Sequence, residues 1–385
     1  MIKNTLEIRK VNTKRIIDYL RHVKYDTKKN IAEDLSLSFA TVSTICNELA
    51  KYKVLKKQNI LKSEGGRIPL ALSIDENSWI SVGIDLTVTN QINLGVMNLK
   101  NNIIHTEQIS YNNGKKIDYI LSTITDKVRE IDEKYTDSSI SGIGISIPGI
   151  YDNKSGMILN STIPLFEEVK LKEELEATLP FDFYIENESN LLVKAVVQID
   201  QKIKEEKMDV IYLFIGEGLG VGIVSGGEIL TGSRGMGAEI GHMPIGSEET
   251  ICSCGNTGCA ENELSFKGFL RKYYGEDRKF TLNDWNAFVK DVKSGKDHAL
   301  NVIKEEACLL GKVISVMINL FDPQILFIGG IIDEIYDYIY PYTLEEAKKR
   351  VLLSNYRDIN IKKTIDKDKL IFIGCNQLVF ENWII

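Results

Sequence analysis

The sequence predicts a small N-terminal winged helix-turn-helix domain followed by a larger α/β body made of two similar halves. Three observations lead to this fold class. Residues 1–72 hold 15 lysines and arginines against 7 aspartates and glutamates, whereas residues 73–385 hold 32 against 47. Apolar residues recur with helical spacing before residue 51. After residue 78, strand-like runs and amphipathic helices alternate in two successive series.

The composition is that of a globular protein with two or three domains. The chain has 385 residues, of which 43% are apolar and 26% are charged. No apolar run approaches the ~18 residues that a membrane span needs, and the N-terminus lacks the apolar segment of a secretory signal. We therefore expect a cytoplasmic protein with no membrane partner. The uneven charge suggests a basic module for a polyanion, although chance clustering of lysines on a solvated face would produce the same counts.

Residues 1–74 are predicted to form the DNA-binding domain. A helix over 11–23 and a short helix over 28–35 precede Ser38, which is a good N-cap for a third helix. The predicted buried stripe of this third helix is Val42, Ile45, Cys46 and Leu49. Its outer face carries small polar residues that allow close approach to base edges in the major groove. We expect DNA contacts from Ser38, Thr41, Ser43, Thr44 and Asn47. A three-helix module that binds protein would have the same helical pattern.

A predicted wing follows the third helix. Two β-like runs, 54–60 and 68–74, flank the segment 62–67 with the sequence KSEGGR. Its two glycines allow a tight tip, and Arg67 would enter a narrow minor groove. Nearby lysines would contact phosphates without reading sequence, namely Lys53, Lys56, Lys57 and Lys62.

The body contains two comparable series of elements. The first series has predicted strands at 78–86, 92–99 and 101–109, a helix at 116–133 and a buried strand at 141–149. The second begins with strand-like residues at 210–230 and continues with an apolar helix at 299–320 and a strand at 324–330. This repetition indicates a duplicated fold with a cleft between two lobes.

The segment 236–264 contains a predicted metal site. His242, Cys252, Cys254 and Cys259 supply one imidazole and three thiolates, which form a closed tetrahedral set for structural zinc. Clustered cysteines in a cytosolic chain favour metal over disulfides, with free thiols in a loop as the alternative. Two carboxylates, Glu239 and Glu261, flank the segment and can accept hydrogen bonds from sugar hydroxyls.

Through these residues the chain resembles the ROK family of repressors, sugar kinases and related open reading frames. The resemblance rests on Glu239-x-Gly-His242 followed by Cys252-x-Cys254-Gly-x-x-Gly-Cys259-x-Glu261, and the N-terminal domain is most similar to that of the xylose repressors. It implies an actin/hexokinase-like (ribonuclease H-like) body. The first lobe would comprise 75–187 with 370–385 packing back, and the second lobe 188–369 with the zinc loop.

The resemblance also assigns site residues. Zinc would be held by His242, Cys252, Cys254 and Cys259. Sugar would contact Asn160, Asn187, Glu188, Glu239, His242 and Glu261. His242 would bind zinc through one ring nitrogen and sugar through the other. Glu188 takes the place of the catalytic aspartate of the family's kinases.

Three departures from the kinase pattern affect ATP use. The first phosphate loop, 85–90, reads DLTVTN and lacks the two glycines and the lysine of Asp-x-Gly-Gly-Thr-Lys. The second loop reads Gly216-Glu217-Gly218 in place of Gly-Thr-Gly, so a carboxylate lies where phosphates would bind. Glu188 is one methylene longer than aspartate, and such misplacement slows chemistry. We therefore expect no catalytic residues and no enzyme activity.

Together these features predict a sugar-responsive transcriptional repressor. A homodimer or a dimer of dimers would bind a pseudo-palindromic operator, and a monosaccharide in the interlobe cleft would release it. Xylose is favoured by the resemblance alone. The main alternative is an ATP-dependent sugar kinase of the hexokinase or glucokinase type fused to a DNA-binding domain. A second alternative is a scaffold whose N-terminal module binds protein.

Overall fold

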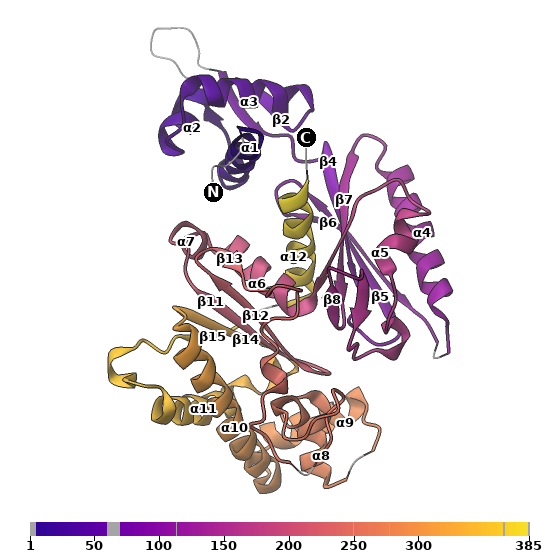
Figure 1. The fold of residues 1–385 in the computed structure, drawn as a ribbon, viewed down its shortest axis with the longest axis vertical. Helices are drawn as coiled ribbons and strands as arrows, with labels where there is room; N and C mark the ends of the chain where they lie inside the picture. Colours follow the sequence, from indigo (N-terminus) through magenta and orange to yellow (C-terminus); the bar gives the residue numbers. More distant parts are fainter. Residues whose placement is uncertain are drawn as a thin grey trace. The chain divides into compact units, whose positions relative to one another are not determined.

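The computed structural model describes residues 5–59, 70–112, 114–248, 250–276, 278–364 and 366–383. The chain forms two compact units (Figure 1). Unit 1 comprises Met1–Ile145, Lys172–Tyr184 and Cys375–Ile385, and unit 2 comprises Ser146–Leu171 and Ile185–Gly374. Within the described ranges, every helix is too short or too polar to cross a bilayer.

Unit 1 begins with three helices, α1 (Thr5–His22), α2 (Lys28–Asp34) and α3 (Phe39–Lys51). The predicted N-cap is confirmed, because the Ser38 hydroxyl accepts a hydrogen bond from the Thr41 amide at 3.1 Å. The buried stripe of α3 is also the predicted one, consisting of Val42, Ile45, Cys46 and Leu49. The first helix starts at Thr5, well before the predicted start at residue 11. The early turns were not predicted because their apolar side chains, such as Leu6, are exposed and form no buried stripe.

The two predicted strands after α3 are confirmed. β2 (Leu55–Asn59) pairs antiparallel with β3 (Leu70–Ile74). A short strand, β1 (Asp26–Thr27), pairs with the other edge of β3. The segment predicted as the wing tip, including Lys62 and Arg67, lies outside the described residues.

The core of this N-terminal region includes side chains from the other end of the chain. Phe380 of α12 (Lys367–Asn382) and the following Trp383 are 5% and 8% exposed. They belong to one apolar cluster with Ile16, Ile17, Leu20, Ile31, Val42, Ile45, Leu49, Leu55 and Leu72. The Arg21 guanidinium lies 3.7 Å from the centroid of the Phe380 ring. The end of α12 is therefore part of the packing that holds α1 and α3.

Two five-stranded sheets form the rest of the architecture. The first has the order β10-β7-β4-β5-β6 and the second the order β13-β12-β11-β14-β15. Their strands are β4 (Trp79–Asp85), β5 (Gln91–Asn98), β6 (Ile103–Ser110), β7 (Ser139–Ile147), β10 (Phe183–Asn187), β11 (Val210–Ile215), β12 (Leu219–Ser225), β13 (Glu228–Ile229), β14 (Ile325–Gly330) and β15 (Ile361–Lys363). Counted along the chain, both sheets place their strands in the order third, second, first, fourth, fifth. This shared topology is the predicted duplication.

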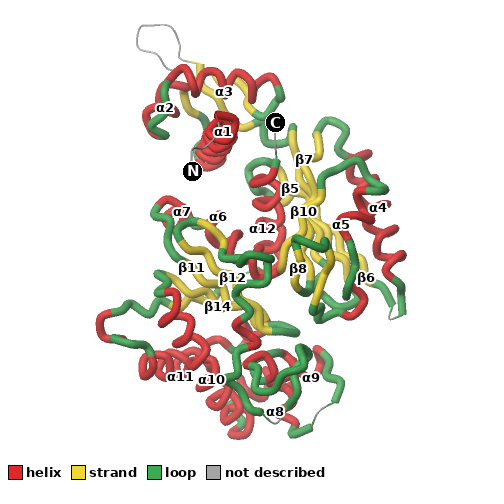
Figure 2. The backbone as a smooth tube through the Cα atoms, in the orientation of Figure 1, coloured by secondary structure: helices red, strands yellow, loops and turns green. Residues whose placement is uncertain are grey.

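Helices and a hairpin complete the fold. They are α4 (Ile117–Lys134), α5 (Leu171–Glu176), α6 (Glu188–Ile199), α7 (Gln201–Glu205), α8 (Phe266–Tyr274), α9 (Leu282–Lys293), α10 (Asp297–Phe321), α11 (Tyr336–Arg350) and the hairpin of β8 (Ile150–Asp152) with β9 (Met157–Leu159). In unit 2, α8 to α11 gather on one side of the second sheet (Figure 2). They share a large apolar core with β11, β12 and β14, and Trp285 of α9 is 1% exposed there.

Candidate metal centre and adjoining polar site

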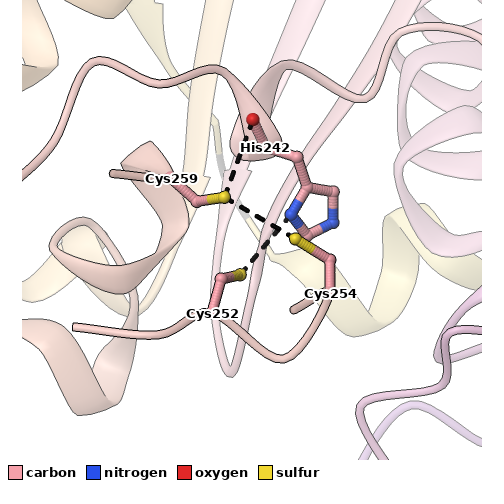
Figure 3. A group of neighbouring side chains, drawn as sticks. All are labelled: His242, Cys252, Cys254 and Cys259. Atoms are coloured by element: carbon pink, nitrogen blue, oxygen red, sulfur yellow. Dashed lines mark hydrogen bonds between the residues drawn. The ribbon is translucent and has the colours of Figure 1, made fainter. Parts of the chain in front are cut away.

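The four predicted metal ligands come together in unit 2. His242, Cys252, Cys254 and Cys259 face a common centre, with their ligand atoms within 4.8 Å of one another (Figure 3). The His242 Nδ1 to Cys252 Sγ distance is 3.6 Å, and the Cys254 Sγ to Cys259 Sγ distance is 3.7 Å. Zinc bonds of ~2.3 Å to sulfur and ~2.1 Å to nitrogen give tetrahedral edges of about 3.6–3.8 Å. These two distances therefore match edges of a tetrahedral zinc site, and all four ligand atoms lie close enough to share one ion.

Turns and short backbone hydrogen bonds position these ligands. The Cys252 amide donates to the Asn256 carbonyl at 2.7 Å, and the Gly255 amide donates to the Cys252 carbonyl at 2.9 Å. Gly255 and Gly258 have φ angles of +88° and +75°, which glycine adopts without strain. Burial, together with hydrogen bonds that the Cys259 thiol donates to the sulfurs of Cys254 and Cys252, raises the pKa of Cys259 to about 12. A thiolate at this position needs a nearby positive charge, and a dication supplies one.

A polar group adjoins the cysteine cluster. His242 Nε2 lies 3.4 Å from the Asn160 side-chain nitrogen, so the two ring nitrogens face the cysteines and Asn160 separately. Partial removal from water raises the pKa of the Glu239 carboxyl; the nearby His242 lowers it and the nearby Glu261 raises it. Glu261 accepts a hydrogen bond from the Leu219 amide at 3.1 Å. The structure thus brings together Asn160, Glu239, His242 and Glu261.

Glu167 is a member of this site that sequence reasoning missed. Its carboxylate accepts hydrogen bonds from the amides of Asn160 at 3.0 Å and Ser161 at 2.6 Å. Asn160 has a φ of +51°, a left-handed conformation that asparagine tolerates better than most residues. Glu167 therefore holds the backbone that presents Asn160 to His242. No local motif marks this carboxylate in the sequence.

Asn187 and Glu188 lie at the start of α6. The Asn187 side-chain oxygen accepts from the Ser189 amide at 2.8 Å, and its side-chain nitrogen donates to the Gly149 carbonyl at 2.8 Å. Glu188 forms an ion pair with Lys367 of α12 at 2.5 Å. These contacts place Asn187 and Glu188 against Gly149, Ser189 and Lys367. Lys367 was not predicted, because it lies far from Glu188 in sequence and just before the C-terminal segment 370–385 that was expected to pack back.

Glycines in β12 allow α6 to lie close to the second sheet. A Cβ atom on Gly220 would lie 2.0 Å from the Ser189 hydroxyl oxygen, and one on Gly222 would lie 2.2 Å from the Ser189 carbonyl oxygen. Any side chain at these two positions would push the first turn of α6 away. Gly220 and Gly222 therefore permit the close approach of α6 that places Glu188 beside the second sheet.

The two altered phosphate loops have compact local structures. In the first, the Asp85 carboxylate is 2% exposed and accepts from the Thr87 amide at 3.0 Å and the Thr87 hydroxyl at 2.7 Å. In the second, the Gly216 amide donates to the Gly218 carbonyl at 2.9 Å, and the Glu217 side chain is exposed. Each loop thus contains internal hydrogen bonds and carries side chains where the kinase pattern has glycine or threonine.

Most candidate DNA contacts lie on the accessible side of α3. Ser38, Thr44 and Asn47 are exposed, while Thr41 and Ser43 are partly exposed. Lys28 of α2 donates to the Asn47 side-chain oxygen at 2.6 Å and to the Ser43 hydroxyl at 3.2 Å. Lys28 therefore adds to this face a positive charge that was not predicted from the sequence.

Known proteins resemble this chain over its length. Residues 81–381 match the ROK family. A putative xylose repressor of Caldicellulosiruptor sp. (strain Rt8B.4) is 28% identical over 97% of this chain and 96% of its own length. A solved structure of a ROK family transcriptional regulator, a homologue of the E. coli MLC protein, superposes with a TM-score of 0.81 at 20% identity and covers 98% of both chains.

A kinase relative covers less of the chain. An N-acetyl-D-glucosamine kinase of Vibrio cholerae is 30% identical over 60% of this chain and 76% of its own length. The family match itself extends over both sheets and the cysteine cluster. The chain belongs to the ROK family.

Proposed function

We propose that this protein is a sugar-responsive transcriptional repressor that does not transfer phosphate. The observation that carries the proposal is that one chain combines two features. The first is a basic N-terminal module with a capped and exposed α3, and the second is the polar group around His242. The xylose repressor relative aligns with 97% of the chain, whereas the kinase relative aligns with 60%. The repressor similarity therefore includes the N-terminal module.

DNA binding is assigned to residues 1–74 as a winged helix-turn-helix. The helix α3 would enter the major groove and the β2–β3 hairpin would form the wing. The proposed contacts are Ser38, Thr41, Ser43, Thr44, Asn47 and Arg67. The remaining chain would form two lobes, 75–187 with 370–385 and 188–369.

Sugar binding is assigned to Asn160, Asn187, Glu188, Glu239, His242 and Glu261, with xylose as the first candidate. The proximity of Glu239, His242 and Glu261 supports this assignment, because carboxylates and an imidazole can bind vicinal hydroxyls. His242, Cys252, Cys254 and Cys259 would hold a structural zinc, whose four protein ligands leave no open position for chemistry.

The proposed mechanism is linkage between two ligands. A homodimer or a dimer of dimers would bind a pseudo-palindromic operator. Sugar would bind more tightly to a conformation with low DNA affinity, and each ligand would weaken the other by the same factor. The altered phosphate loops and Glu188 support binding without phosphoryl transfer, because neither loop retains the kinase pattern.

The first prediction tests sugar release. Fluorescence anisotropy would measure the affinity for DNA from the protein's own promoter, with ATP omitted and a sugar panel added. We expect one sugar to weaken specific binding. Glu239→Gln should lower sugar affinity about tenfold or more, because it removes a charged hydrogen-bond acceptor, and should leave DNA affinity without sugar unchanged. Glu228→Gln, an exposed change on β13, is the matched control.

Two results would contradict the proposal. Sugar-dependent ATP turnover of ~1 s⁻¹ or more would identify a kinase. DNA binding without a preferred site at any salt concentration would instead favour a protein-binding scaffold, because a specific binder keeps its preferred site as salt weakens affinity.

A further inference from the structure

A lysine at the start of α12 holds the proposed sugar contact Glu188. The Lys367 ammonium lies 2.5 Å from a Glu188 carboxylate oxygen. The two side chains are 23% and 13% exposed, so water screens this pair less than it screens a surface pair. The same ammonium lies 4.7 Å from the centroid of the Phe214 ring, a cation–π contact that further fixes its position.

Backbone packing ties the same two helices together at a second point. A Cβ atom on Gly374 of α12 would lie 2.3 Å from the Leu191 carbonyl oxygen of α6. The helices therefore meet without an intervening side chain. Buried residues along α12, including Leu370 at 3% exposure and Ile371 at 0%, restrict independent movement of this helix. A displacement of the first turn of α6 must therefore be accommodated by α12.

Helix α12 contributes residues to both units. Residues 367–374 belong to unit 2, and residues from Cys375 onward belong to unit 1. Within unit 1, Phe380 and Trp383 are part of the apolar cluster that holds α1 and α3. The helix that begins at the Glu188 ion pair thus ends in the core of the proposed DNA-binding module.

We propose that Lys367 is a positioning residue that couples sugar binding at Glu188 to the position of α12, and through α12 to the N-terminal module. This inference rests on the proposed function. A sugar hydroxyl that donates to Glu188 must share a carboxylate that is mostly buried and already holds Lys367. Sharing the carboxylate weakens its hold on the Lys367 ammonium in the sugar-bound protein, and this change supplies the difference in affinity that a conformational response needs.

The test compares the sugar response of three substitutions. Lys367→Met removes the charge and keeps an unbranched stem, Lys367→Arg keeps the charge, and Lys369→Met makes the same change at an exposed lysine one half-turn along α12. For each full-length protein, DNA affinity is measured with and without saturating sugar, and sugar affinity is measured by calorimetry. Thermal unfolding and zinc content verify that each variant is folded.

In the wild type, we expect sugar to weaken DNA binding by a factor within the usual range of about 5–150. Lys367→Met should reduce this factor to within about twofold of unity while still binding sugar. Its DNA affinity without sugar should shift toward that of the sugar-bound wild type, because the ion pair that sugar weakens is already absent. Lys367→Arg and Lys369→Met should keep the wild-type factor. If Lys367→Met does not fold, Lys367→Gln provides the same test with a polar side chain.

The inference would be overturned if sugar weakened DNA binding by the full wild-type factor in the neutral Lys367 variants. It would also be overturned if Lys369→Met lost the sugar effect on DNA binding as completely as Lys367→Met. These outcomes differ from failure of the proposed function itself. In that case the wild-type protein would show no effect of any sugar on DNA binding.

Discussion

At the residue scale, Glu306 shows how burial sets the behaviour of a single carboxyl group. This side chain of α10 is 0% exposed and lies 2.9 Å from the Lys272 ammonium of α8. Burial raises its pKa to about 7, although the attraction of Lys272 opposes the shift. The native state therefore holds a proton at Glu306 that the unfolded chain, with an ordinary glutamate pKa, releases near pH 4.5.

This raised pKa predicts a pH-dependent stability difference. Between about pH 4.5 and 7 the native state binds more protons than the unfolded state, so this group's contribution to stability falls as pH rises through that window. Glu306→Gln cannot ionise, so its stability relative to the wild type should increase from pH 5 to pH 8 by up to about 3 kcal/mol. Denaturant unfolding at several pH values measures the difference.

Glu305→Gln is the control for this prediction. Glu305 is the adjacent residue, also pairs with Lys272 at 3.1 Å, and its side chain is 62% exposed. Its stability difference from the wild type should change little with pH, because an exposed pair is screened by water. Parallel pH profiles for Glu306→Gln and the wild type would contradict the raised pKa.

We expect the order of the cysteine loop to depend on the proposed metal. The segment around Cys252–Cys259 is held by turns, two isolated bridges and a few backbone hydrogen bonds, and Ile251 within it is 77% exposed. A loop with so little apolar burial would gain its order from the proposed metal and its ligands. Loss of the metal should therefore disorder the loop and displace Glu261, which follows it.

Cys254→Ser tests this dependence. Replacing one thiolate should reduce zinc content from about one per chain to near zero and lower stability on the order of several kcal/mol, because metal binding contributes to folding. Sugar affinity should fall at the same time. Cys308→Ser, at an exposed cysteine of α10 outside the cluster, should change neither zinc content nor stability. A zinc-free Cys254→Ser protein with a full sugar response would rule out the structural role.

Elements with local signals were predictable from the sequence, and contacts between distant elements were not. The cap at Ser38 and the stripe of α3 depend on neighbours within one helix. The four metal ligands occur within a short segment, so their spacing alone indicated a cluster. In contrast, the support of Asn160 by Glu167 and the pairing of Glu188 with Lys367 arise only when the chain folds. A lone carboxylate or lysine carries no periodicity that marks such a role.

For the whole molecule, the division of charge decides where DNA can bind. Residues 1–72 have an excess of basic residues, and residues 73–385 have an excess of acidic residues. The net charge of −7 is therefore the sum of a positive N-terminal part and a more strongly negative body. A polyanion should be attracted to the N-terminal module and repelled by the body. The exposed lysines of β2, such as Lys57, are then expected to contact phosphates without selecting a sequence.

Lys57→Gln and Lys290→Gln make the same charge change on the two parts of the chain. Lys57 is exposed on β2, and Lys290 is exposed on α9. Removing one phosphate contact should weaken DNA binding uniformly across sequences and reduce the slope of log affinity against log salt by about 1. Lys57→Gln should show both effects in a salt titration, and Lys290→Gln should show neither. Equal losses would mean that DNA also contacts the acidic body, because its net charge repels phosphate and only direct contact would make Lys290 matter.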